Sequence, residues 1–102
     1  MVWVAGTAPI GEDGATVGVG DVGRQTRRCF EVAARALGDV GASLDDVVRT
    51  RIMLTDIATW EQAAAVHGEL FAEVRPACTF VEVSGFIDPT WLVEVEVDAH
   101  LG

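Results

Sequence analysis

The sequence contains no lysine, and its seven basic residues are all arginine. Sixteen acidic residues outnumber them and give a formal net charge of −9. A protein of this charge repels phosphate backbones, so we do not expect nucleic acid as a partner. The sequence also lacks any apolar run near the roughly 18 residues that a membrane-spanning helix needs. We therefore expect a soluble protein that contacts no membrane.

Cysteine and histidine are scarce as well, with Cys29, Cys78, His67 and His100 as the only examples. None of the four stands at the paired spacing of a metal site, so the sequence predicts no bound metal. The start, MVWVAGTAPIG, lacks the basic residues and long apolar core of a secretory signal. We expect a cytoplasmic protein with two free thiols.

One glycine pattern, GVGDVG at 18–23, matches the G-x-G-x-x-G form of dinucleotide-binding loops. That form requires a buried strand running into the loop. The residues before it, EDGATV, are typical of a hairpin turn instead. We therefore interpret the pattern as a turn followed by a helix cap.

Half of the residues are hydrophobic, and their spacing along the chain indicates one α+β domain over residues 1–102. Apolar residues at helical spacing follow Asp21, a good N-cap, and stop near Gly41. Alternating and β-branched runs predict strands. The expected order is strand 2–6, hairpin arm within 7–20, helix 21–41, strand 47–54, helix within 59–74, and strands 78–83 and 92–101. Such a small chain buries little surface alone, so we expect it to form an oligomer.

Alternation within the strands predicts which side chains share a face of the sheet. In 92–101 the valines alternate with acidic residues, and we expect the valines beneath the helices. The same rule places Cys78, Phe80 and Glu82 on the acidic face. Cys78 and Glu94 are therefore predicted to lie on one side of the sheet.

Each polar residue of interest also has a structural interpretation. His67 lies in the apolar stripe of the second helix and fits a hydrogen-bonded, packed histidine. Arg49 and Arg51 share a strand face, where they could pair with the acidic row across the sheet. Cys78 either fills space at the start of a strand or carries chemistry with Glu94 as a proton carrier.

Three stretches resemble one known family over essentially the whole chain. GASLDDVVRTRIMLTD at 41–56, RPACTFVEV at 75–83 and the following VEVEVDA are similar to the RidA/YjgF family of reactive intermediate deaminases, formerly described as endoribonuclease L-PSP or translation inhibitors. The resemblance implies a chorismate mutase-like fold with two helices on one face of a mixed sheet. It also implies a homotrimer with ligand clefts between subunits.

The family hydrolyses enamines and imines to a 2-oxo acid and ammonia without a cofactor. By this resemblance the glutamate that orients water falls on Glu94. The arginine that clamps the substrate carboxylate falls on Cys78, because PACT stands where the family has PARS. A thiol cannot form the bidentate clamp of a guanidinium. Gly6, Phe80 and Trp91 are the other residues expected to bind substrate.

Other departures bear on the same cleft. A helix asparagine and a serine of the family correspond to Ala64 and Ala5. The family also has a further strand ahead of VWVAG, which this sequence lacks.

These departures leave three functions open. The first is hydrolysis of an imine or enamine that the usual arginine does not anchor. The second is a non-catalytic trimer that binds a small molecule. The third, a ribonuclease or translation inhibitor, is opposed by the net charge of −9.

Overall fold

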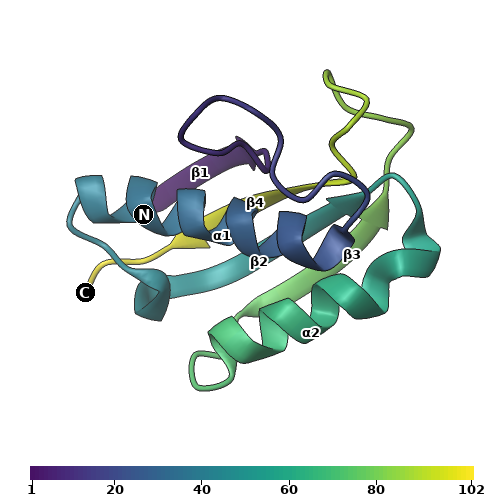
Figure 1. The fold of residues 1–102 in the computed structure, drawn as a ribbon. Helices are drawn as coiled ribbons and strands as arrows, with labels where there is room; N and C mark the ends of the chain where they lie inside the picture. Colours follow the sequence, from purple (N-terminus) through teal and green to yellow (C-terminus); the bar gives the residue numbers. More distant parts are fainter.

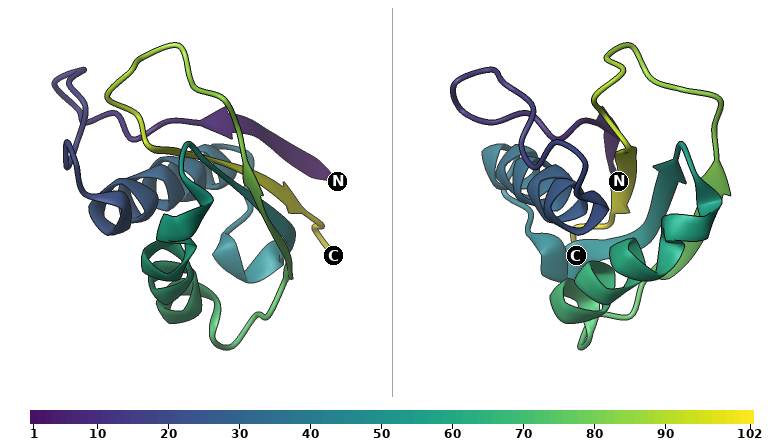
Figure 2. Two further views of the ribbon diagram at one scale, coloured as in Figure 1. Left: turned by 90° about the vertical axis from the view of Figure 1, so that its right-hand side faces the viewer. Right: turned by 45° about the vertical axis from the view of Figure 1, so that its right-hand side comes forward.

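The computed structural model describes residues 1–102. Two helices cover one face of a four-stranded sheet (Figures 1 and 2). The elements in chain order are β1 (Val2–Thr7), α1 (Val22–Asp39), η1 (Leu44–Asp46), β2 (Val47–Leu54), η2 (Ile57–Thr59), α2 (Trp60–Phe71), β3 (Ala77–Glu82) and β4 (Val93–Ala99). The strand order is β1-β4-β2-β3, in which only β2 and β3 run parallel. The expected α+β class is confirmed.

Helix α1 begins and ends as its sequence predicts. The Asp21 carboxylate accepts a hydrogen bond from the Arg24 backbone at 3.0 Å and caps the first turn. Gly41 follows the helix with a φ of +82°, a conformation that favours glycine. Between these ends, the buried stripe that includes Phe30 and Leu37 packs on β4 and β1.

A capping box at Ser43 leads into β2, and an irregularity follows at once. The register between β2 and β4 shifts between Val47 and Arg49. Val47 is therefore buried, while Val48 is 46% exposed. From Thr50 onward the predicted alternation is confirmed.

His67 of α2 is a packed, hydrogen-bonded residue, as its structural interpretation predicts. Its Nε2 lies 2.9 Å from the Thr50 hydroxyl of β2. Its ring contacts Phe30 and Phe71. Burial lowers the pKa of His67 from its ordinary value.

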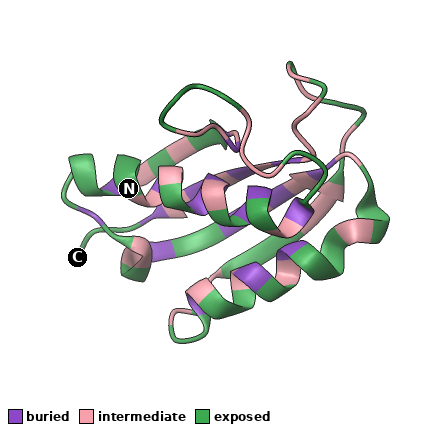
Figure 3. Ribbon diagram, viewed as in Figure 1, coloured by how far each residue is buried: buried purple, intermediate pink, exposed green.

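The predicted face assignment of β3 is wrong. Cys78 pairs with Thr50, and Phe80 pairs with Ile52. Partners in a parallel ladder point to the same side, and Thr50 and Ile52 are buried on the helix side. Cys78 and Phe80 therefore belong to the helix side of the sheet, opposite the acidic row. β3 is an edge strand with no fully buried residue (Figure 3), so its alternation does not indicate which face points toward the helices.

The face opposite the helices carries the charged residues of β2 and β4. Arg51 and Glu96 form the ion pair expected across this face. Trp3 of β1 lies in register with Asp98 on the same side and is 71% exposed. Nothing in the chain covers this face, and we call it the open sheet face. Neither helix is long and apolar enough to cross a membrane.

Two long connections project at the same end of the sheet (Figure 1). Residues 8–21 contain only an isolated bridge between Ile10 and Thr16, so the expected hairpin arm is not a strand. The second connection is the 83–92 loop. The two are joined where the hydroxyls of Thr16 and Thr90 lie 2.7 Å apart.

Candidate functional site

A cavity of about 600 Å³ opens where these two connections meet the sheet and α1. This volume suits a small metabolite. Its walls come from the end of β1 and the turn that follows, one face of α1, the 83–92 loop, and β4. The lining residues are Gly6, Thr7, Ala8, Ile10, Gly11, Glu12, Arg28, Val32, Arg35, Ile87, Trp91 and Glu94.

Glu94 is the acidic residue that β4 supplies to this cavity. Burial raises the pKa of Glu94 above its ordinary value, and the charge of Glu96 two residues along the strand raises it further. Such a carboxyl holds and releases a proton nearer to neutral pH than an ordinary glutamate does. The cavity therefore contains one carboxyl group whose pKa is raised.

Gly6 makes room for that carboxylate. The pairing of β1 with β4 is irregular between Val4 and Thr7, and Gly6 lies in this irregular segment. A Cβ atom at Gly6 would lie 2.7 Å from Oε1 of Glu94, which is too close for two non-bonded atoms. Glycine therefore allows the backbone of β1 to approach the side chain directly.

Trp91 forms part of the wall and is held by a buried amide. The side chain of Gln25 accepts a hydrogen bond from the Leu92 backbone at 2.8 Å and donates one to the Thr90 carbonyl at 2.9 Å. The indole Nε1 of Trp91 itself is buried without a hydrogen-bond partner. A buried donor without a partner costs about 1–3 kcal/mol.

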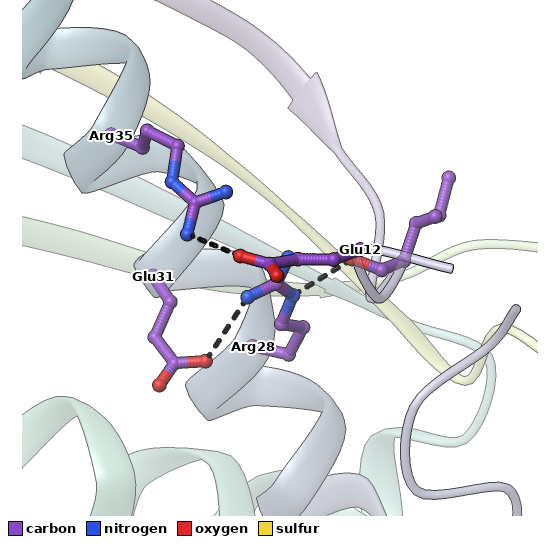
Figure 4. A network of polar contacts seen from close by, with 5 residues as sticks. Glu12, Arg28, Glu31 and Arg35 are labelled. Carbon is purple, nitrogen blue, oxygen red and sulfur yellow. Dashed lines mark hydrogen bonds and ion pairs between the residues drawn. The ribbon is translucent and has the colours of Figure 1, made fainter. Parts of the chain in front are cut away.

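Two arginines on α1 line the cavity, and the sequence reasoning missed them both. Arg28, Val32 and Arg35 stand four and three residues apart, so they share one face of the helix. Figure 4 shows Arg28 beside Glu31 and the carbonyl of Ile10, and Arg35 beside Glu12. The available signal was this spacing, which places both arginines next to the buried stripe.

The other predicted site residues divide into two groups. Gly6, Trp91 and Glu94 lie together in the cavity, while Cys78 and Phe80 do not line it. Phe80 packs edge-on against Trp60, with ring centroids 5.9 Å apart.

Cys78 stands apart from Glu94 in three ways. The two strands β3 and β4 are separated by β2, the two residues belong to opposite sheet faces, and their register positions differ. Two strand spacings of about 4.8 Å alone place their backbones roughly 10 Å apart. One chain therefore does not bring the thiol and the carboxylate together.

The charged residues of the cavity do not form a metal centre. No three histidine, cysteine, aspartate or glutamate side chains converge anywhere in the chain in a way that could hold a metal ion. Cys29 follows the cavity residue Arg28 in sequence, but its side chain is buried in the core. Burial and the charge of Glu94 both raise the pKa of its thiol. It serves packing.

Comparisons with known proteins agree with this architecture. A protein of Streptomyces coelicolor, SCO2049, is 40% identical over 101 residues, which cover 99% of this chain and 75% of the relative. The 3-aminoacrylate deaminase RutC of Acinetobacter baylyi is 38% identical over 101 residues, which cover 99% of this chain and 79% of RutC.

Solved structures give the same result. Rv2704 of Mycobacterium tuberculosis, described as a member of the YjgF/YER057c/UK114 family, superposes with a TM-score of 0.86 at 42% identity, over 97% of this chain and 77% of that one. Residues 1–101 match the family described as Endoribonuclease L-PSP. The chain therefore belongs to the endoribonuclease L-PSP family, which is the RidA/YjgF family that its sequence resembles.

Proposed function

We propose that this protein hydrolyses an imine or enamine intermediate in the cavity around Glu94. The observation that carries the proposal is the position of Glu94, a carboxyl with a raised pKa beside Gly6 in a cavity of about 600 Å³. The similarity to a 3-aminoacrylate deaminase supports the reaction class, because 3-aminoacrylate is itself an enamine. The substrate is one that no arginine at position 78 anchors.

The chemistry requires a group that first takes and then returns a proton. An enamine becomes an imine when its β-carbon takes up a proton from solvent and its nitrogen gives one up. Water then attacks the imine carbon while Glu94 takes a proton from the water, and the π electrons move to the nitrogen, which takes a proton from solvent. The carbinolamine next accepts the proton of Glu94 on nitrogen, ammonia leaves, and the hydroxyl loses its proton as the carbonyl forms. One imine and one water thus give one carbonyl compound and one ammonia.

The assembly that we propose is a homotrimer with the cavities at the subunit boundaries. The uncovered sheet face, with Trp3 71% exposed, supports an interface there. Cys78 and Phe80 lie outside the cavity of their own chain. Their proposed contact with substrate therefore requires the β3 edge of a second subunit at the mouth of the cavity.

The test is an assay against a panel of imines and enamines. Amino-acid-derived imines are generated in place by an amino-acid oxidase, and semicarbazide traps the imine that survives. We expect the protein to reduce trapping and to increase ammonia and carbonyl product above the buffer rate. No acceleration with any member of the panel would overturn the proposal. Thermal stabilisation by the same compounds without turnover would instead indicate a protein that binds them without catalysis.

A further inference from the structure

We propose that Arg28 binds the anionic group of the ligand in this cavity, in place of the arginine that the family carries at the position of Cys78. The assignment rests on the proposed function for the identity of the reacting group, but not for the binding of the anion. It makes Arg28 a specificity-determining residue and predicts a ligand with a carboxylate.

The position of the guanidinium is the first argument. Arg28 leaves only 14% of its side chain exposed, although it carries a full positive charge. Its Nε donates a hydrogen bond to the Ile10 carbonyl at 2.7 Å, which fixes the direction of the planar group (Figure 4). A held guanidinium is organised for bidentate binding of a carboxylate.

The unused donors are the second argument. A guanidinium has five N–H donors, and within the chain only Nε of Arg28 makes a hydrogen bond. The nearest acid, Glu31, lies 3.6 Å from the terminal nitrogen NH1, beyond hydrogen-bond range, and is 57% exposed. An ion pair at this distance to an exposed acid contributes little to the free energy of folding. The terminal nitrogens therefore remain available for a ligand.

The composition of the cavity is the third argument. Arg35 lies two turns further along the same face and pairs with Glu12 at 3.2 Å, with both side chains largely exposed. That pair sits at the solvent side, whereas Arg28 is the sheltered cation. Ile10, Val32 and Trp91 supply an apolar wall. Such a cavity matches a small molecule with one anionic end and an apolar remainder.

Glu94 lines the same cavity as Arg28 but forms no ion pair with it, so it does not occupy the terminal nitrogens of the guanidinium. The buried, unpaired Nε1 of Trp91 adds a donor in the wall, which an acceptor on the ligand could satisfy after a small movement of the indole.

The test measures binding and needs no turnover. The full-length protein is titrated by calorimetry with 2-oxobutanoate and with its methyl ester, which keeps the same carbon chain but adds one methyl group and carries no charge. We expect the acid to bind at least about tenfold more tightly than the ester, as a charge-assisted pair requires. Arg28→Gln should remove that preference and leave ester binding unchanged. Arg28→Lys should restore part of it, because lysine keeps the charge without the fork.

Arg27→Gln is the matched control, since Arg27 is the adjacent residue and pairs with Glu69 on the surface. It should bind the acid as the wild type does. Equal affinity for acid and ester, no binding of either, or an unchanged preference in Arg28→Gln would each overturn the assignment. If Arg28→Gln does not fold, the acid-to-ester ratio of the wild type and the Arg28→Lys variant decide the question.

The two proposals fail separately. Hydrolysis of neutral and carboxylated imines at equal rates would uphold the proposed function and overturn the role of Arg28. An Arg28-dependent preference for the acid without any hydrolysis would uphold the role of Arg28 and overturn the catalytic function.

Discussion

At the scale of single residues, the proposed site depends on Gly6 and Glu94. Gly6 has no Cβ, and the space that a Cβ would occupy is taken by the carboxylate of Glu94 at 2.7 Å. Glu94 carries a raised pKa because it is partly buried and faces the charge of Glu96. Packing alone requires neither a carboxyl group with a raised pKa at position 94 nor a glycine beside it at position 6.

Gly6→Ala tests this arrangement. The added methyl group must displace the carboxylate, since Oε1 is the near atom and the side chain can turn. We expect imine hydrolysis to fall by about 10- to 100-fold, because small displacements of a catalytic group are costly. The melting temperature should change little, because Gly6 is exposed. Steady-state rates and thermal unfolding measure the two effects.

Gly38→Ala is the control for this substitution. Gly38 lies near the end of α1, and a Cβ there would contact nothing within 4 Å. It should keep wild-type activity. Full activity in Gly6→Ala would contradict the account of Glu94.

At the scale of elements, α2 is attached to the sheet through a polar contact inside the packed layer. Thr50 of β2 and His67 of α2 lie 2.9 Å apart, beneath the rings of Phe30 and Phe71. Burial lowers the pKa of His67, so the folded state favours the neutral imidazole. The unfolded chain takes up this proton first as the pH falls. The stabilising contribution is therefore complete above about pH 6.5 and is lost as the pH falls through the folded pKa.

This linkage predicts that the free energy of unfolding declines as the pH falls below about 6.5. His67→Gln should reduce the decline, because an amide can still meet the Thr50 hydroxyl but does not titrate. Urea unfolding at several pH values measures both proteins. The carboxylates titrate in both proteins, so the difference between the two free energies of unfolding at each pH gives the contribution of His67 alone. Parallel curves for the two proteins would contradict the buried neutral histidine.

The elements also show which features a sequence can predict. α1 and β4 were predicted well, because a capped helix with one buried stripe and a strand with one buried face repeat their signal at every period. β3 was assigned to the wrong faces, because an edge strand has no buried row and takes its orientation from the register with β2. The cavity arginines were missed for a related reason. The other parts of the cavity wall, the 8–12 turn and the 83–92 loop, are far apart in sequence and meet only in the fold.

At the scale of the whole molecule, the open sheet face is the surface through which we propose that chains associate. The helices bury the valines of β4, and the opposite face exposes Trp3 beside the charged rows of β2 and β4. A chain of 102 residues gains from covering such a face. A homotrimer would cover it and place the β3 edges near neighbouring cavities.

We expect light scattering after gel filtration to give three times the chain mass of 10.8 kDa. Trp3→Glu should reduce the mass toward that of one chain, because it places a charge on the covered face. Val19→Glu, at a residue that is 69% exposed outside the sheet, should leave the mass unchanged. A wild-type protein that stays a single chain at micromolar concentration would contradict the proposed assembly.

The hydrolysis rate of one amino-acid-derived imine, measured side by side for three proteins, tests the central claim most directly. The wild type and Glu69→Gln, which removes an equal charge from a surface ion pair on α2, should accelerate the reaction equally. Glu94→Gln should lose at least about a hundredfold, the lower range for loss of a general acid-base group, while its circular dichroism spectrum stays that of the wild type. A folded Glu94→Gln protein with the wild-type rate would contradict the account.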